Sequence, residues 1–183
     1  MKDERCENGL KIRRYRAAEA NGLVEVVLKS IPEISAWDSW AHPGYGYEDA
    51  IEWVALARRL WREQIEFHFV VVDEKSARIL GGAGIKRLDW DNRSAEIGYW
   101  IGTEFTRKGM GTRAARLCAA YAFEELEMQR VEFIIDVDNI ASRRVAEKTG
   151  AVKEGVLRSR LIRDGAVRDA CIYGLLSGEI KTL

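Results

Sequence analysis

The stretch Ser94–Gly150, SAEIGYWIGTEFTRKGMGTRAARLCAAYAFEELEMQRVEFIIDVDNIASRRVAEKTG, decides the fold of this chain. It begins with a short apolar strand, Glu96–Ile101, and continues with a basic, glycine-rich turn, Thr106–Thr112. A long amphipathic helix follows the turn, and a second apolar strand, Val131–Val137, then leads to Asn139 and a short helix. A turn of this kind at a helix N-terminus presents unpaired backbone N–H groups and the positive end of the helix dipole. The sequence therefore predicts a phosphate-binding turn.

Hydrophobic spacing extends this pattern along the rest of the chain. The predicted strands are Leu10–Tyr15, Phe67–Val72, Ile79–Ile85, Glu96–Ile101, Val131–Val137 and a hairpin, Ala151–Arg163 with Ala166–Leu176, that turns at Asp164-Gly165. The predicted helices are Ala17–Ser30, which Pro32 ends, Glu48–Gln64, Gly109–Met128 and Asn139–Thr149, with an irregular aromatic-rich segment over Glu33–Tyr47. This order predicts an α/β fold of a single domain, residues 1–183, with one mixed sheet and helices on its faces.

Three glycines interrupt the strand predicted over Ile79–Ile85. Gly81, Gly82 and Gly84 offer no side chains to pack and therefore weaken the strand. Glycines placed in this way indicate a bulge or a close approach of another group to the backbone.

Composition restricts the class of protein. The 183 residues are 47% hydrophobic and 32% charged, which is typical of a soluble globular domain. Lysine plus arginine equals aspartate plus glutamate, so bulk charge favours neither nucleic acid nor a membrane as a partner. Three scattered cysteines and two histidines show no metal-ligand spacing, so no metal site is predicted. The charged N-terminus and the lack of an apolar run of ~20 residues predict a cytoplasmic protein.

The glycine-rich turn has a second interpretation. Residues 109–114, GMGTRA, satisfy the dinucleotide-binding fingerprint, and Asp136 ends the next strand near where a ribose-binding acid is expected. In that fingerprint, however, the first glycine follows its strand almost at once, whereas Gly102–Lys108 intervene here. The preceding sheet is also predicted to be built from meandering strands rather than from a first βαβ unit. Both features disfavour dinucleotide binding, and no Walker motif is present.

Three motifs in this order, AEIGYWI, RKGMGT and DNIASRRVAEKTGAVKEGVLR, resemble those of the GNAT superfamily of N-acetyltransferases. Within the superfamily, the chain is similar to the RimJ/RimL-like branch of ribosomal-protein N-terminal acetyltransferases, over roughly residues 10–176. The resemblance implies a central, mostly antiparallel sheet that is splayed between two central strands, with helices on both faces. It also implies that acetyl-CoA is the co-substrate.

The resemblance implies where acetyl-CoA binds. Its pyrophosphate would lie on the turn formed by Arg107, Lys108, Gly109, Met110, Gly111 and Thr112, which offers both N–H donors and cations. Its pantetheine arm would lie between the two splayed strands and contact the backbone near Trp100 and Ile101. Arg107, Arg143 and Lys148 are candidates for the adenosine 3′-phosphate. For Arg116 and Arg130 we expect an ordinary solvated face instead.

Asn139 and Ser142 have two compatible interpretations. Taken alone, Asn139 would cap the short helix and Ser142 would lie in its first turn. The resemblance implies in addition that the Asn139 amide contacts the pantetheine and that the Ser142 hydroxyl lies near the sulfur. A residue can cap a helix and also bind a ligand.

The chain departs from the family pattern at three positions. Thr106 stands where the turn often begins with glutamine or arginine, and Ala151 stands where an aromatic residue is usual. Ala146 occupies the position at which many members carry a tyrosine general acid. Any acid for the departing thiolate would then be Ser142 or water.

Acetyl transfer to an amine also needs a group that accepts the amine's proton. Glu66, at the start of a predicted strand beside the expected pocket, and Glu96, inside a central strand, are the candidates. An exposed strand-end carboxylate is the alternative for Glu66, and a paired structural carboxylate is the alternative for Glu96, because an unpaired charge there would be costly. We favour Glu66 as the base, and we expect the backbone near Ile101 to donate a hydrogen bond to the thioester oxygen.

The acceptor amine is the least determined part of the prediction. Trp37, Trp40 and Tyr45 would form either a lid over the core or a wall of the acceptor pocket. A protein N-terminus, a polyamine, an amino acid and an antibiotic amine are all compatible with the sequence, and the RimJ/RimL-like resemblance favours a protein or peptide α-amine. A non-catalytic acetyl-CoA sensor is the alternative function, and a homodimer is left open.

Overall fold

The structure, a computed structural model, describes residues 2–163 and 165–181, so Asp164 of the predicted hairpin turn lies outside the described residues. The strands are β1 (Glu4–Glu7), β2 (Leu10–Arg14), β3 (Phe67–Asp73), β4 (Ile79–Asp89), β5 (Ser94–Ile101), β6 (Arg130–Asp136), β7 (Val152–Arg163) and β8 (Ala166–Leu176). The helices are α1 (Ala20–Leu28), α2 (Ile31–Ser35), α3 (Tyr47–Arg62), α4 (Met110–Glu124) and α5 (Ile140–Thr149), with single 3₁₀ turns at Ala17–Glu19 and Thr103–Phe105.

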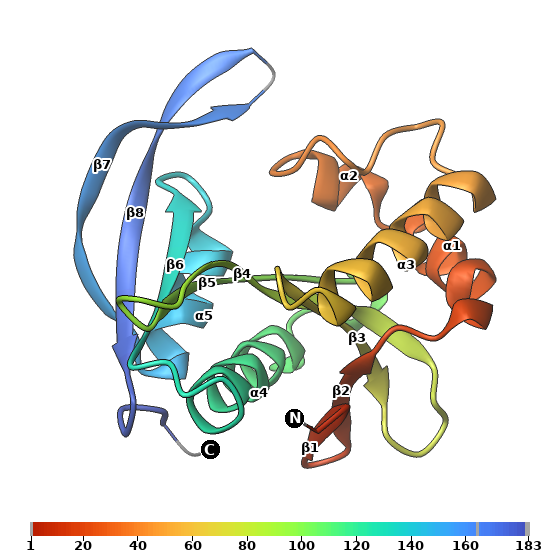
Figure 1. Ribbon diagram of the computed structural model, residues 1–183. Coiled ribbons are helices and arrows are strands. Elements are labelled where there is room, and N and C mark those ends of the chain that lie inside the picture. Colours follow the sequence, from red (N-terminus) through yellow and green to blue (C-terminus); the bar gives the residue numbers. More distant parts are fainter. Residues whose placement is uncertain (1, 164, 182–183) are drawn as a thin grey trace.

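All of these strands form one sheet, in the order β1-β2-β3-β4-β5-β6-β8-β7. Every neighbouring pair is antiparallel except β5 and β6, which are parallel and lie at the centre. Figure 1 shows β7 and β8 as a long hairpin that extends beyond the rest of the sheet. The arrangement confirms the predicted α/β class and its mostly antiparallel central sheet.

The two central strands separate after a short contact. Ser94–Glu96 pair with Arg130–Glu132, and the pairing then stops, although both strands continue. Beyond that point β5 stays paired with β4, and β6 stays paired with β8, so neither strand loses its other neighbour. The facing edges of β5 and β6 therefore carry backbone groups that are free to bond a ligand. This is the predicted splay.

Each face of the sheet has its own core, because side chains alternate along a strand. On β3, Phe67, Phe69 and Val71 belong to a buried cluster that includes α4, whereas Val70 and Val72 belong to a second cluster with α1 and α3. Helices thus cover both faces, as Figure 1 also shows. Because His68 lies between Phe67 and Phe69 on β3, its side chain points to the opposite face of the sheet, which α1 and α3 cover.

Two predicted boundaries were wrong. The helix predicted over Gly109–Met128 ends at Glu124, because Glu127 has a left-handed backbone (φ 55°) and Met128 N–H bonds back to the carbonyl of Ala122. Pro32 does not end the first helix, which already stops at Leu28. It stands in the first turn of α2, where its missing N–H would have no partner in any case.

The prediction that Arg116 lies on a solvated face was also wrong. Arg116 is only 3% exposed, and its guanidinium pairs with the carboxylate of Glu7. Glu7 belongs to β1, a strand that the sequence pattern did not predict and that packs beside α4. A buried arginine needs a partner of opposite charge, and the unrecognised strand supplies it. Arg130 is half-buried and bonded to Glu132 and Glu154.

Candidate active site

The glycine-rich turn lies where the sequence placed it, at the N-terminus of α4. The first hydrogen bond of the helix runs from Arg113 N–H to Gly109 O (3.1 Å), so the N–H groups of Met110, Gly111 and Thr112 come before it and have no helical partner. Arg107 and Gly109 both have left-handed backbones, with φ of 59° and 75°. These conformations curl the turn, and such a turn forms a concave anion site.

Two cations belong to this turn. Arg107 and Lys108 are exposed, as is Gly109 between Lys108 and the helix. The ammonium of Lys108 bonds the carbonyl of Glu104 at 3.1 Å, which folds the lysine back along its own loop. The turn therefore combines unpaired N–H groups, the positive end of a helix dipole and exposed positive charge, which suits a diphosphate group.

A side chain at position 111 of the turn would be crowded by its neighbours. A Cβ placed there would lie 3.1 Å from a ring carbon of Tyr99 and 3.5 Å from a methyl carbon of Val145. The N-terminus of α4 thus packs directly on β5 and on α5, at the place where β5 and β6 have separated. The glycine-rich turn therefore lies next to the gap between β5 and β6.

The start of α5 has the predicted cap and one contact that was not predicted. The Asn139 side-chain oxygen accepts a hydrogen bond from Ser142 N–H at 3.0 Å, so the capping interpretation is confirmed. The Ser142 hydroxyl lies 3.0 Å from the hydroxyl of Tyr99 on β5. Burial raises the pKa of Tyr99 to about 12, so its phenol stays protonated at neutral pH.

The two basic candidates on α5 lie in different surroundings. Arg143 donates to the carbonyl of Val137 (2.9 Å) and to the hydroxyl of Tyr173 (3.2 Å), so its guanidinium is engaged between β6 and β8. Lys148 is exposed and stands one helical turn beyond Val145, the residue that faces Gly111. Of the two, Lys148 is the one whose charge is available to a ligand at the turn.

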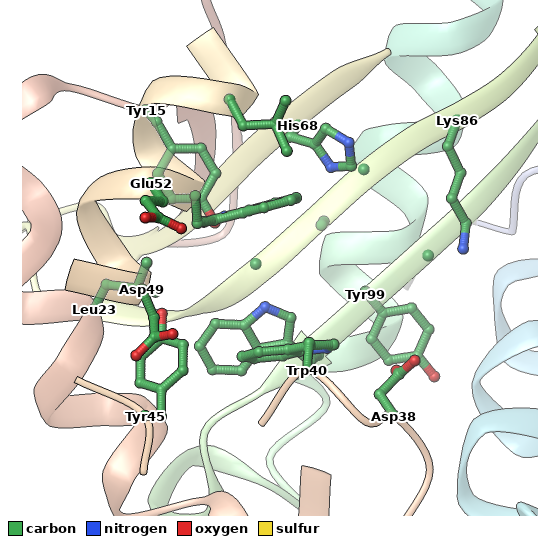
Figure 2. A pocket seen from close by; sticks show the side chains of 17 residues that line it. Tyr15, Leu23, Asp38, Trp40, Tyr45, Asp49, Glu52, His68, Lys86 and Tyr99 are labelled. Carbon is green, nitrogen blue, oxygen red and sulfur yellow. The ribbon is translucent and has the colours of Figure 1, made fainter. Parts of the chain in front are cut away.

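A cavity of about 470 Å³ opens on the α1 and α3 face of the sheet. Figure 2 shows His68 and Lys86 on the sheet side of the cavity, while Tyr15, Asp49 and Glu52 lie across from them. Tyr99 and, from the segment between α2 and α3, Asp38 and Trp40 also line the cavity. Burial raises the pKa of Asp38, and the charge of Lys86 opposes that rise.

Glycines form the floor of this cavity. A Cβ at Gly82 would lie 2.5 Å from the indole nitrogen of Trp100, and a Cβ at Gly84 would lie 2.6 Å from Nδ1 of His68. Side chains from the neighbouring strands therefore lie flat across β4. The close approach that the glycines predicted is confirmed, and the predicted bulge is present where the β3–β4 register shifts after Val71.

Of the three aromatic residues predicted to form a lid or an acceptor wall, two line this cavity. Trp40 and Tyr45 line the cavity and contact each other edge to face, with ring centroids 6.0 Å apart. Trp40 also packs against Trp100 at 5.4 Å. Trp37 does not line the cavity; it stacks under the guanidinium of Arg163 near the tip of the β7–β8 hairpin, at 5.0 Å.

The two candidate carboxylates differ in their partners. Both oxygens of Glu96 are paired, one with Lys86 at 3.0 Å and the other with Arg87 at 2.6 Å, which favours the structural interpretation of Glu96. Glu66 bonds Nε2 of His68 at 2.7 Å and does not itself line the cavity. This bond holds the pKa of Glu66 below its usual range, so Glu66 is a carboxylate at neutral pH.

Sequence reasoning missed two side chains at this site, His68 and Tyr99. The alternation in FHFVVV already opposed His68 to Phe67 and Phe69, so its face could have been read from the pattern. The Tyr99–Ser142 contact had no such signal, because the two residues are 43 positions apart.

Two kinds of feature are lacking in the part of the chain that the structure describes. Histidine, cysteine, aspartate and glutamate side chains nowhere gather there in a group of three that could hold a metal ion. None of the described helices has both the length and the apolar character needed to cross a bilayer.

Residues 10–152 match the family model described as acetyltransferase (GNAT) domain. Among curated proteins, the chain is 34% identical over 147 residues to YdaF of Bacillus subtilis (strain 168), which is named as a ribosomal N-acetyltransferase, and the match covers 77% of this chain and 76% of YdaF.

Two solved structures share the fold. One, from Vibrio cholerae and named as a ribosomal-protein-serine acetyltransferase, superposes with a TM-score of 0.83 at 25% identity, covering 94% of this chain and 97% of its own. The other is RimL, a ribosomal alpha-N-protein acetyltransferase in complex with coenzyme A, with a TM-score of 0.85 at 19% identity, covering 93% and 95%.

Proposed function

The chain belongs to the acetyltransferase (GNAT) domain family and is an acyltransferase that uses acetyl-CoA, and from this premise we propose that it acetylates the α-amine of a protein or peptide by direct attack. One observation carries the proposal. Tyr99 is one of the residues that line the cavity, its ring lies against the N-terminus of α4, and its hydroxyl bonds Ser142 at the start of α5. The cavity and the splay between β5 and β6 therefore share a wall, where an amine and a thioester can meet.

The residues of the chain suit acetyl-CoA along its whole length. Unpaired N–H groups of Met110, Gly111 and Thr112, with Arg107 and Lys108, would hold the pyrophosphate. The free edge of β5 at Trp100 and Ile101 would bond the pantetheine amides. The Asn139 amide would contact the same arm. Lys148 is the better placed of the α5 cations for the 3′-phosphate, since Arg143 is already engaged.

The chemistry that we propose needs three groups from this chain. A backbone N–H near Ile101 would stabilise the charge that develops on the thioester oxygen. The paired hydroxyls of Tyr99 and Ser142 would supply a proton to the departing thiolate; Tyr99 is the better donor because its phenol stays protonated. The amine's proton would leave on the β3 side of the cavity, where Glu66 lies.

An acceptor with a cationic amine suits the cavity. Asp38, Asp49 and Glu52 line it together with aromatic side chains, so an ammonium group would be attracted before it is deprotonated. An α-amine titrates at ~7.7–8.0, whereas a lysine-type amine titrates at ~10, so an α-amine needs less help from a base. The relative YdaF, which is named as a ribosomal N-acetyltransferase, supports a protein acceptor.

The alternative, a non-catalytic acetyl-CoA sensor, rested on the alanine at position 146. Tyr99 weakens that argument, because it places a phenol beside Ser142 from another strand. The experiment that tests the proposed function is acetyl-CoA binding by calorimetry together with release of free thiol in the presence of an amine panel. The panel should contain peptides with free N-termini, polyamines and amino acids.

We expect binding of acetyl-CoA and thiol release with peptide α-amines above all. Binding of acetyl-CoA with no thiol release for any amine would refute the enzymatic proposal. Release confined to polyamines or amino acids would leave the acetyl transfer intact and refute the peptide acceptor.

A further inference from the structure

We propose that His68, held by Glu66, is the group that accepts the proton of the acceptor amine. The inference rests on the proposed function and deepens it, because it names the base and turns Glu66 into a positioning residue. Its basis is the geometry of one row of residues across the sheet.

His68 lies in register with two glycines. On β3 it is paired with Gly84 of β4, and Gly84 is paired with Gly98 of β5. Gly98 is two residues beyond Glu96, the last residue of β5 that pairs with β6, so it stands where the splay begins. Neighbouring strands are about 4.8 Å apart, so His68 is roughly 10 Å from the edge of the splay. A Cβ at Gly98 would lie 3.4 Å from Cε and 3.6 Å from Nζ of Lys86, so the Lys86 side chain of β4 lies over the second glycine of this row.

The imidazole covers half of this distance. A Cβ at Gly84 would lie 2.6 Å from Nδ1 of His68, which means that the ring leans from β3 over β4. Trp53 of α3 packs edge-on against the ring, with centroids 4.8 Å apart, and holds it from the other side. An acceptor amine would reach Nδ1 of His68 from the cavity, beside the Lys86 side chain, directly or through one water molecule.

Glu66 fixes which nitrogen is free. Its carboxylate bonds Nε2 of His68 at 2.7 Å, and a carboxylate can only accept a hydrogen bond. In the neutral ring the proton therefore resides on Nε2, and Nδ1 keeps a lone pair over Gly84. Glu66 does not line the cavity, so it acts on the acceptor only through His68. Its charge also stabilises the imidazolium that forms when Nδ1 takes a proton.

Charged groups of both signs surround the pair. Asp49 and Glu52 of α3 and Asp38 of the segment before it line the same cavity as His68. Lys86 of β4 lines it as well, and its ammonium is bonded to Glu96 at 3.0 Å. The Arg87 backbone bonds Glu66, and the Arg87 guanidinium is paired with Glu96 as well. Tyr15 adds a neutral phenol, because burial raises its pKa well above the usual range.

The proton balance of the step is closed. The ammonium form of the acceptor loses one proton to Nδ1 of His68, and its nitrogen then attacks the thioester carbon. As the C–S bond breaks, the thiolate receives a proton from Tyr99, Ser142 or water. The positively charged nitrogen of the tetrahedral intermediate gives up its second proton, which replaces the one donated to the thiolate. One proton thus goes to the thiol and one passes from His68 to solvent. No oxidant, reductant or metal is needed.

The test compares His68→Gln with Glu66→Gln in the thiol-release assay, as kcat/KM for the acceptor from pH 5 to 8.5. Glutamine at 68 keeps a side chain of similar length but has no group that titrates. We expect His68→Gln to lower kcat/KM by about 10²-fold or more and to leave only the acid limb that the acceptor's own titration produces. We expect Glu66→Gln to lower kcat/KM less and to retain an acid limb, because the imidazole is still present and has lost only the bond that positions its Nε2. The protonation of the acceptor amine changes with pH in the same way for all variants, so it does not contribute to differences between their pH profiles.

The second histidine of the chain is the matched control. His42 is exposed, lies 3.6 Å from Asp49 and does not line the cavity, so His42→Gln should keep both the rate and the acid limb. Melting temperature and acetyl-CoA affinity of each variant report whether the fold is retained. If His68→Gln does not fold, His68→Asn serves the same comparison. Nitrogen NMR of the wild-type ring should show the proton on Nε2.

An unchanged acid limb in folded His68→Gln would overturn the inference. A complete loss of activity in Glu66→Gln, with the wild-type acid limb retained in His68→Gln, would overturn it in favour of Glu66 as the direct base. Both results presuppose that the wild-type protein transfers acetyl groups. A wild-type protein without thiol release would instead refute the proposed function, so the two failures are distinguishable.

Discussion

Substitution of Gly111 by aspartate or asparagine is the sharpest test of the phosphate turn. The two side chains have nearly the same size and differ in charge at neutral pH. Each would place its Cβ 3.1 Å from a ring carbon of Tyr99 and 3.5 Å from Val145, so each forces the same adjustment of the neighbours. We expect that adjustment to cost about 1–3 kcal/mol of stability in both variants. Any difference between the two variants in stability or in acetyl-CoA affinity therefore reports the effect of the side-chain charge alone.

The negative charge of the aspartate should stabilise the free protein and destabilise its complex with acetyl-CoA. Gly111 lies in the first turn of α4, where a carboxylate interacts favourably with the helix dipole, by about 0.3–1 kcal/mol. The aspartate variant should therefore melt no lower than the asparagine variant. With acetyl-CoA bound, the carboxylate would face a phosphate charge, and two unit charges about 4 Å apart repel by ~4 kcal/mol at an effective dielectric of 20.

The assay is calorimetric titration with acetyl-CoA at two salt concentrations. Screening and a small shift of the ligand would reduce the repulsion, so we expect aspartate to bind at least about 100-fold more weakly than asparagine, which corresponds to ~2.7 kcal/mol. The ratio should shrink as ionic strength rises. Equal affinities of the two variants, both folded, would show that no phosphate lies at the N-terminus of α4.

Three further predictions concern the thiol end and the acid stability of the protein. Asn139→Ala removes the acceptor of Ser142 N–H and should cost about 1 kcal/mol of stability in a melting experiment. If Asn139 also binds acetyl-CoA, the variant should in addition lose turnover or acetyl-CoA affinity. A destabilised but fully active variant would show that Asn139 only caps the helix. If the Tyr99 phenol donates a proton to the departing thiolate, Tyr99→Phe should lower kcat by about 10²-fold and retain acetyl-CoA affinity. An unaltered kcat would assign the proton of the thiol to Ser142 or water. The lowered pKa of Glu66, caused mainly by its bond to His68, contributes stability that is present above the unfolded pKa of glutamate and is lost as pH falls through the folded value. The melting temperature of Glu66→Gln should therefore fall less than that of the wild type between pH 7 and pH 3, and parallel curves would contradict the assignment.

The sequence by itself determined the class of the fold and the location of the turn. Helical and strand periodicities are local, so the pattern of apolar residues alone places α3, β3, β5, β6 and the β7–β8 hairpin within a few residues of their observed bounds. The glycine-rich turn is equally local, because unpaired N–H groups follow from any helix N-terminus. The cap at Asn139 depends only on a residue three positions away.

Tertiary structure decided the contacts that join distant segments. Arg116 is buried because Glu7, 109 residues away, packs beside α4, and nothing local distinguishes it from an exposed arginine. Tyr99 meets Ser142 only because β5 and β6 separate after Glu96 and leave room for the start of α5. His68 lies in one row with the start of the splay because the register of three strands aligns it with Gly84 and Gly98. Register between strands is set by the packing of the whole sheet, and a shift of one residue would turn His68 to the opposite face.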